Sequence, residues 1–315
     1  MNSIQEKVSR LKKNIEKVIF GKSEAIGFAI TCLLAKGHLL IEDVPGVGKT
    51  SLAHCLANSL HLDFKRIQFT NDLFLPADIT GVSIYDQGEK RFHFQKGPLF
   101  ANIVLADEIN RSTPGTQSAL LEAMNEKQVS ADNNTYDLEE HFMVIATQNL
   151  IESQGTYPLP ESQLDRFMFY ISMGYPSQDE ERRLLQEQST RPNPASIQPV
   201  LEKEEVLKLQ TLVNSVNIEP VLTDYILNII SATRENPNLA LGVSPRGGLI
   251  FQQALRARAL VCGRDYCTPD DVKYLAIPVL CHRVIPQSHN LSHKRRFADT
   301  ATIIHQILEQ VSVPV

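Results

Sequence analysis

The chain has 315 residues, of which 43% are hydrophobic and 21% charged, so it is long enough for two domains and can bury a substantial core. Its 31 Lys and Arg residues and 36 Asp and Glu residues give a formal net charge of −5, a balance that argues against a dedicated binder of nucleic acids or anionic membranes. The apolar stretch over residues 25–35 is about half of a membrane span, and the opening residues lack the apolar core of a signal peptide. We therefore expect no membrane segment.

The five cysteines bear on the compartment in which the protein works. Their spacing matches no zinc site, and their odd number leaves one thiol without a partner. Reduced, mostly buried thiols in a cytoplasmic protein are the interpretation that we favour.

The first half of the chain alternates short apolar runs with helical patterns. A run over residues 38–43 is followed by glycines and then by an amphipathic helix that begins near Lys49. The other strand-like runs cover residues 64–69, 102–107, 142–147 and 167–172. Strands separated by helices predict an α/β fold with a parallel sheet and helices on both faces. The patterns over residues 82–94 and 127–139 predict two inserted hairpins.

The character of the sequence changes after Tyr175. Ser177 and Glu180 form a capping box, and Thr268 begins another capped helix with a proline in its first turn. We predict helices and no strand from here to the end. The predicted boundary between an α/β domain (residues 1–175) and a smaller helical domain (residues 176–315) therefore lies near residues 174–177.

The loop after the first strand resembles a phosphate-binding loop with one departure. The strict pattern is Gly, four residues, then Gly-Lys-Ser/Thr, but Asp43 stands where the first glycine belongs. Gly46 and Gly48 still allow a phosphate to approach the backbone at a helix N-terminus, Lys49 can reach the β- and γ-phosphates, and the Thr50 hydroxyl can bind Mg²⁺. A simple glycine turn before a helix is the alternative, which the strand-loop-helix context and the Lys-Thr pair disfavour.

Polar residues also end two later strands. Asp107 and Glu108 follow an apolar run, so Asp107 can hold the Mg²⁺ shell and Glu108 can orient the attacking water. Asn149 ends another run and can contact both the γ-phosphate and that water. Taken alone, paired acids often mark only a solvated turn, and an asparagine is common in turns. Their position beyond a phosphate loop makes the acids a strong signal.

At these residues the chain resembles the MoxR family of AAA+ ATPases over nearly its whole length. The segments that carry the resemblance, in family order, are QFTNDLFLPADITG, GPLFANIVLADEINRSTPGTQSALLEAMNEKQV, ATQN, GTYPLPESQLDRF and SPRG. The resemblance implies a P-loop NTPase core with a five-stranded parallel sheet, an all-helical lid, and a ring homo-oligomer, usually a hexamer, with ATP at the subunit interfaces. It also implies a helix-2 insert at about residues 76–97 and a hairpin before sensor 1 at about residues 127–141.

The resemblance assigns further roles residue by residue. Asn149 corresponds to sensor 1, Arg166 to the arginine finger that reaches a neighbour's γ-phosphate, and Arg246 to sensor 2, which extends from the lid to the subunit's own nucleotide; Arg111 is a second candidate for the finger. The segment that flanks the adenine corresponds to Val18, Ile19, Phe20 and Gly21, and the nucleotide loop consists of Pro45, Gly46, Val47, Gly48, Lys49, Thr50 and Ser51.

The predicted function is Mg²⁺-dependent hydrolysis of ATP to ADP, by a chaperone-like remodeller or maturation factor for partner proteins or metal-containing complexes. The resemblance implies that a client can be a protein with a von Willebrand factor A domain. A nucleotide-gated binding scaffold with incidental turnover is the alternative. A nucleic-acid motor ranks third, because the charge balance is acidic and no DNA-binding module is recognisable.

Overall fold

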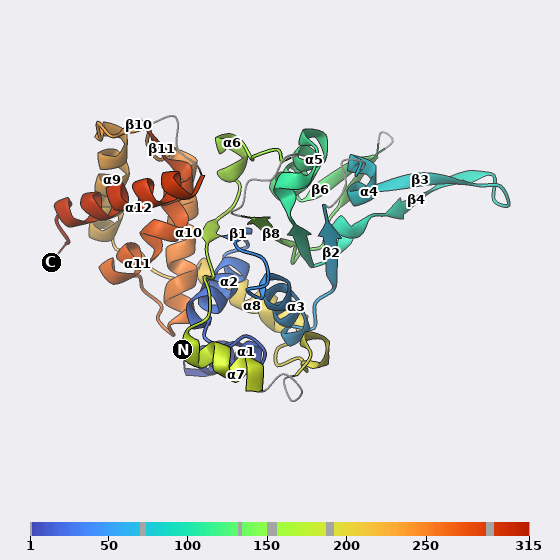
Figure 1. Cartoon of the computed structure of the whole chain (residues 1–315), viewed down its shortest axis with the longest axis horizontal. Coiled ribbons are helices and arrows are strands. Elements are labelled where there is room, and N and C mark those ends of the chain that lie inside the picture. The colour runs from blue at the N-terminus through green and yellow to red at the C-terminus, as the bar shows by residue number, and fades with distance from the viewer. Residues whose placement is uncertain are drawn as a thin grey trace.

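A computed structural model describes residues 2–69, 74–131, 134–149, 156–186, 192–287 and 293–314. A parallel sheet lies at the centre between two layers of helices (Figure 1). A long hairpin, β3–β4, extends from one end of the molecule, and a group of C-terminal helices lies at the other end.

The central sheet has five strands in the order β2-β5-β8-β1-β9, and every neighbouring pair is parallel. The strands are β1 (Leu39–Asp43), β2 (Phe64–Gln68), β5 (Ile103–Asp107), β8 (Met143–Asn149) and β9 (Phe169–Ile171). Each falls within or next to a run predicted from the apolar pattern, so the predicted five-stranded parallel core is confirmed. Because the strands are parallel, Asp43, Asp107 and Asn149 all end at the same edge of the sheet.

The two faces of the sheet are covered by different helices. Odd-numbered residues of β1, β5 and β8, such as Ile41 and Leu105, pack into the core beneath α1 (Asn2–Glu16), α2 (Ser23–Leu34), α3 (Lys49–Ser59) and α8 (Lys203–Val213). Even-numbered ones, such as Leu40 and Val104, face α4 (Pro76–Thr80), α5 (Pro114–Glu126) and α6 (Glu161–Leu164). Side chains alternate along a strand, so Asp43, Asp107 and Asn149 all belong to the face that carries α3.

A buried histidine links three elements at the opposite edge of the sheet. His38 precedes β1; its Nδ1 accepts from Val144 N at 2.9 Å, and its Nε2 lies 3.2 Å from the carbonyl oxygen of Met124 in α5. This pattern requires the neutral ring with the proton on Nε2. Burial lowers the pKa of His38 to about 4.

The C-terminal helices pack beside β9, the last strand of the sheet. They are α9 (Pro220–Glu235), α10 (Pro245–Val261), α11 (Pro269–Leu280) and α12 (His293–Gln310). The helix α7 (Gln178–Gln186) lies apart from them (Figure 1) and contacts the connection between α1 and α2 through Glu180 and Gly21. The predicted capping box of Ser177 with Glu180 is present, and the predicted cap at Thr268 is also a capping box, with Asp271 as its partner. Short 3₁₀ helices are η1 (Pro98–Phe100), η2 (Ile109–Arg111), η3 (Pro194–Ser196) and η4 (Cys281–Arg283).

The prediction of no strand after Tyr175 is wrong in one detail. β10 (Leu239–Leu241) and β11 (Ile285–Pro286) form a small antiparallel pair. Runs of three and two residues are too short to show alternation in a sequence. The lid is otherwise helical, as predicted, and the boundary between residues 1–175 and 176–315 stays a prediction. Among the described helices, none combines the length and apolar character needed to cross a membrane.

The two inserted hairpins are present and touch each other. β3 (Gly81–Asp86) pairs with β4 (Arg91–Lys96), and β6 (Gln128–Ala131) pairs with β7 (Asn134–Asp137). Phe94 of the first hairpin stacks on Tyr136 of the second with ring centroids 4.0 Å apart. The first hairpin also exposes Tyr85 and Phe92, the latter at 70% of its surface.

Candidate functional site

The loop after β1 keeps an open cradle at the start of α3. Gly46 and Gly48 have φ of +86° and +99°, values that favour glycine. A Cβ placed on Gly46 would have no neighbouring atom within 4 Å, and one on Gly48 would first meet Ile19 at 3.8 Å. The space beside the backbone N–H groups is therefore free for an anion of the size and charge of a phosphate.

Lys49 connects this cradle to the strand ends. The residue is 7% exposed, and its Nζ donates to the carbonyl oxygens of Asp43 (2.9 Å) and Gln148 (3.4 Å) and to Oδ1 of Asn149 (3.3 Å). Burial lowers the pKa of Lys49, while the nearby carboxylates of Asp43, Asp107 and Glu108 raise it. The positively charged ammonium group of Lys49 is thus held at the sheet edge by neutral oxygens, and a phosphate can replace them as its hydrogen-bond acceptors.

Asp43, the residue that departs from the strict pattern, holds the segment that follows β9 through its carboxylate. Its Oδ2 accepts from Met173 N and Gly174 N, both at 2.6 Å, and from Ser172 Oγ at 2.9 Å. Its Oδ1 accepts from Val44 N at 2.8 Å. The carboxylate therefore ties the phosphate loop to the segment that follows β9.

Asp107 is held on both oxygens. Oδ1 accepts from Thr147 Oγ1 at 2.6 Å, and Oδ2 accepts from Arg66 Nε at 3.1 Å and Nη2 at 2.5 Å. Arg66 lies on the edge strand β2 and was not predicted as a site residue. A carboxylate has about four lone-pair positions, so Asp107 retains acceptor capacity toward a hydrated cation.

Glu108 stands in a conformation that a non-glycine residue rarely adopts. Its φ of +59° and ψ of +48° lie in the left-handed region, where the backbone is held by a bond from Glu108 N to Thr147 Oγ1 at 2.9 Å. The carboxylate accepts from Asn149 Nδ2 on Oε1 and from Arg111 Nη1 on Oε2, both at 2.9 Å. Asn149 and Glu108 are thus brought together as the sequence predicts, and Arg111 pairs with the glutamate of its own chain.

A second part of the pocket lies between the α1–α2 connection and α7. A cavity of about 150 Å³ is lined by Ile19, Phe20, Lys22, Gly46, Val47, Gly48, Ser51, Pro176 and Leu184. Val18, which also belongs to the predicted adenine segment, is fully buried and does not line the cavity. Gly21, with φ of +70°, contacts Glu180 so closely that a Cβ there would lie 1.7 Å from the carboxylate oxygen. The predicted adenine segment borders this cavity, and Pro176 and Leu184 join it through tertiary contacts that no local pattern predicts.

Arg166 and Arg246 lie at the opposite edge of the sheet. Arg166 Nη1 donates to Leu121 O at 3.0 Å, and Arg246 Nη2 donates to Asn125 Oδ1 at 2.8 Å, so the two guanidinium groups contact positions one turn apart on α5. This end of α5 meets His38 at the amino end of β1. A five-residue strand separates that edge from the carboxyl edge by about 15 Å.

Arg246 therefore does not extend toward the nucleotide site of its own subunit, as the resemblance had implied, but contacts α5. The lid is fixed near the amino edge because Arg283 of η4, whose side chain is 1% exposed, pairs with Asp165 and donates to Phe167 O at 2.5 Å. His282 Nε2 contacts the same carbonyl oxygen at 2.9 Å. These contacts place α10 and Arg246 beside Arg166, facing away from the phosphate loop.

The residues present suit a magnesium nucleotide. The open glycine cradle and Lys49 suit phosphate oxygens, while the Thr50 hydroxyl at the start of α3 and the Asp107 carboxylate supply the hard oxygen ligands that Mg²⁺ prefers. The helix α3 begins at the carboxyl edge of the sheet and covers the face to which Asp107 belongs.

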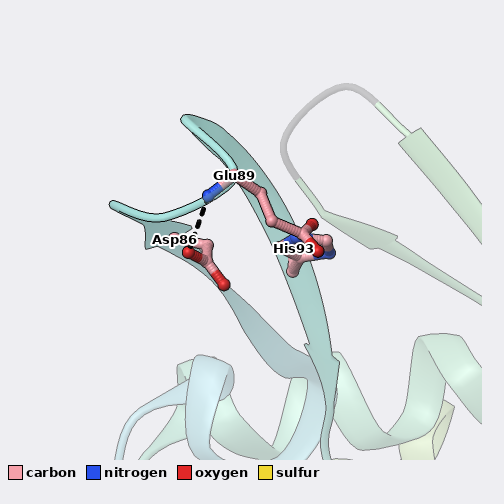
Figure 2. Close-up of side chains that lie close together, drawn as sticks. All are labelled: Asp86, Glu89 and His93. Carbon is pink, nitrogen blue, oxygen red and sulfur yellow. Dashed lines mark hydrogen bonds and ion pairs between the residues drawn. The ribbon is translucent and has the colours of Figure 1, made fainter.

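A separate cluster lies at the tip of the β3–β4 hairpin, where Asp86, Glu89 and His93 approach one another (Figure 2). Asp86 Oδ1 accepts from the turn N–H groups of Gly88 and Glu89, and Glu89 Oε2 pairs with Arg91 and His93. All three residues are exposed. Their contacts are those of a stabilised hairpin turn.

A phosphate loop on one strand, paired acids on the next but one, and an asparagine on the strand between them, all at one edge of a parallel sheet, define a P-loop nucleotide-binding protein. Residues 38–169 match the family described as the ATPase family associated with various cellular activities (AAA), and residues 231–307 match the AAA lid domain.

Relatives that align with nearly the whole chain identify the family within this class of P-loop proteins. An uncharacterised protein of Bacillus subtilis, YeaC, is 47% identical, with 96% of this chain and 93% of that protein aligned. Chaperone MoxR1 of Mycobacterium tuberculosis is 40% identical over 95% of this chain and 80% of its own length. The crystal structure of a candidate ATPase from Cytophaga hutchinsonii superposes with a TM-score of 0.89 at 36% identity, covering 99% of this chain and 96% of that one. The chain belongs to the MoxR family of AAA+ ATPases.

Proposed function

We propose that the protein hydrolyses ATP to ADP in a Mg²⁺-dependent reaction. The observation that carries this proposal is the convergence of Lys49, Asp107, Glu108 and Asn149 on one edge and one face of the sheet, around an open phosphate cradle. Each of these side chains is connected to another by a hydrogen bond or through a shared partner, so their relative positions are fixed before nucleotide binds.

Each residue has a separate task in this proposal. The N–H groups of residues 46–50 and the ammonium of Lys49 bind the phosphates, and Thr50 and Asp107 hold the metal, largely through water. Bound Mg²⁺ would neutralise charge on the transferring phosphate. Glu108 orients and polarises the attacking water, and Asn149 keeps that carboxylate in place through its bond to Oε1.

The site is completed, in this proposal, by a second copy of the chain in a ring, which we take to be a hexamer. Arg166 faces away from its own nucleotide edge, which supports its assignment as the finger that serves a neighbour. Arg246 lies beside it, so we assign it to the same neighbouring site. Arg111 is the weaker candidate because it pairs with its own Glu108.

Mixing two variants tests this shared site. Glu108→Gln and Arg166→Ala should each reduce turnover at least about a hundredfold with little change in nucleotide affinity. Mixed oligomers should recover roughly a quarter of the wild-type rate, since that share of interfaces joins an intact Glu108 to an intact Arg166. Verified mixed oligomers with no recovery would refute a site shared between subunits.

The work done by hydrolysis is proposed to be remodelling or maturation of a client. The two hairpins are joined by the stack of Phe94 on Tyr136, and β6–β7 leads directly into β8 and Asn149, so a change at the nucleotide has a covalent route to the hairpins. One relative is named a chaperone, which supports this class of role. A protein with a von Willebrand factor A domain is the client that we would test first. The free, mostly buried cysteines agree with the proposed cytoplasmic location.

The rival functions make different predictions for turnover. A remodeller should hydrolyse ATP faster when the client is present, whereas a nucleotide-gated scaffold should bind the client without any change in rate. Stimulation by DNA would favour a nucleic-acid motor. The Glu108→Gln protein with ATP should retain a client of a remodeller, and release of that client on washing with ATP still present would count against the remodelling proposal.

A further inference from the structure

Arg66 is the cation nearest to the proposed metal ligand, and it belongs to neither the phosphate loop nor the predicted acids. On β2 its neighbour Ile67 is buried toward α5, so Arg66 points to the α3 face, on which Asp107 also lies. The guanidinium donates through Nε and Nη2 to the single oxygen Oδ2 of Asp107. The Asp107 side chain is 11% exposed and that of Arg66 41% exposed.

This contact places a permanent positive charge where a metal ion would bind. A guanidinium cannot lose its proton at any relevant pH, so it repels a divalent cation that approaches Asp107. A metal on its own must overcome that repulsion and compete for Oδ2. A metal that arrives with a triphosphate brings enough negative charge to offset Arg66. Partial exposure of Arg66 weakens these effects through solvent screening without removing them.

We propose that Arg66 is a positioning residue that makes metal binding at Asp107 conditional on nucleotide. In the nucleotide-free protein Arg66 holds the carboxylate in place together with Thr147 and weakens the binding of free Mg²⁺; the negative charge of a bound nucleotide would offset Arg66 and allow Asp107 to help to hold the metal. This inference rests on the proposed ATPase function and adds an order to its binding steps.

The chain offers a matched control for this idea. Lys65 is exposed on the same strand and, by the alternation of side chains, points to the opposite face from Arg66. Lys65→Gln and Arg66→Gln therefore remove the same charge from adjacent positions, and only the second removes the contact with Asp107. Arg66→Lys keeps the charge but loses the two-pronged donor.

Binding of Mn²⁺, used in place of Mg²⁺, can be measured by electron paramagnetic resonance with and without ADP. Without nucleotide we expect Arg66→Gln to bind Mn²⁺ about tenfold more tightly than the wild type, with Lys65→Gln and Arg66→Lys within about threefold of the wild type. ADP should strengthen Mn²⁺ binding by a correspondingly smaller factor in Arg66→Gln. Thermal unfolding by circular dichroism verifies that each variant is folded.

Three outcomes count against the proposals, and they are distinguishable. If Arg66→Gln and the wild type bind Mn²⁺ equally without nucleotide, while Mn²⁺ and ADP bind together normally, the role of Arg66 is refuted and the proposed function stands. If Arg66→Lys gains affinity as much as Arg66→Gln, the repulsion argument is refuted. If the wild type binds no Mn²⁺–ADP at all, the proposed function itself is refuted.

Discussion

Replacing Asp43 with alanine should destabilise the protein, although Asp43 is the residue that departs from the strict phosphate-loop pattern. Asp43 is 2% exposed, and its carboxylate accepts from the N–H groups of Met173 and Gly174 at 2.6 Å. A hydrogen bond to a charged group contributes about 1.5–3 kcal/mol. Gly174 is only half-buried and can be rehydrated, so we expect a total loss of about 3 kcal/mol. Asp43→Gly, which restores the pattern, should lose at least as much, because glycine also weakens the strand.

Thermal unfolding followed by circular dichroism is the appropriate assay, because the chain contains no tryptophan to report by fluorescence. A loss of this size should lower the midpoint by about 5 °C in a chain of this length. Asp63→Ala is the control, since it removes the same charge from an exposed position next to β2. A midpoint for Asp43→Ala within about 1 °C of that control would show that the carboxylate does not fasten the segment after β9.

Two further predictions concern other parts of the core. Burial lowers the pKa of His38 to about 4, so as the pH falls the imidazole of the unfolded chain is protonated before that of the folded protein. The free energy of unfolding should therefore fall by about 3 kcal/mol as the pH drops from 6.5 to 4. Urea titrations at about pH 7 and pH 5 should show a smaller fall for His38→Gln than for the wild type, and equal falls would refute the assignment. Gly21→Ala forces a side chain into a left-handed backbone and against Glu180, so ADP should bind a few-fold more weakly; unchanged affinity would mean that this connection does not shape the pocket.

Much of the fold was predictable because the signals are local. Each of the five strands is a short apolar run bounded by polar or turn residues, and the strands alternate with helices, so their existence and parallel arrangement follow from the sequence. The position of the acids beyond a phosphate loop predicts their place in the site, and the resemblance identifies Asn149 as sensor 1; in the fold these residues meet because parallel strands present their carboxyl ends at one edge. The hydrogen bonds of Glu108 with Asn149 and of Lys49 with Asn149 bear out their common location.

What could not be predicted depends on contacts between distant segments. Arg66 meets Asp107 only because β2 pairs with β5 in a register where Gln68 lies opposite Asp107, and nothing near Arg66 in the sequence fixes that register. The position of Arg246 depends on Arg283, which fastens the lid near the start of β9. Resemblance alone therefore placed Arg246 at its own nucleotide, whereas the packing of the lid places it beside Arg166.

The most direct test of the central claim is a comparison of ATP binding and phosphate release in the wild type and Glu108→Gln. The amide oxygen of the substituted side chain would still accept the bond from Asn149, but an amide cannot polarise water as a carboxylate does. We expect wild-type protein to release phosphate from ATP only when Mg²⁺ is present, and the variant to bind ATP with unchanged affinity while its phosphate release falls at least about a hundredfold. A variant that retains most of the wild-type rate would contradict the role of Glu108, and a wild-type protein that neither binds nor hydrolyses Mg²⁺–ATP would contradict the account as a whole.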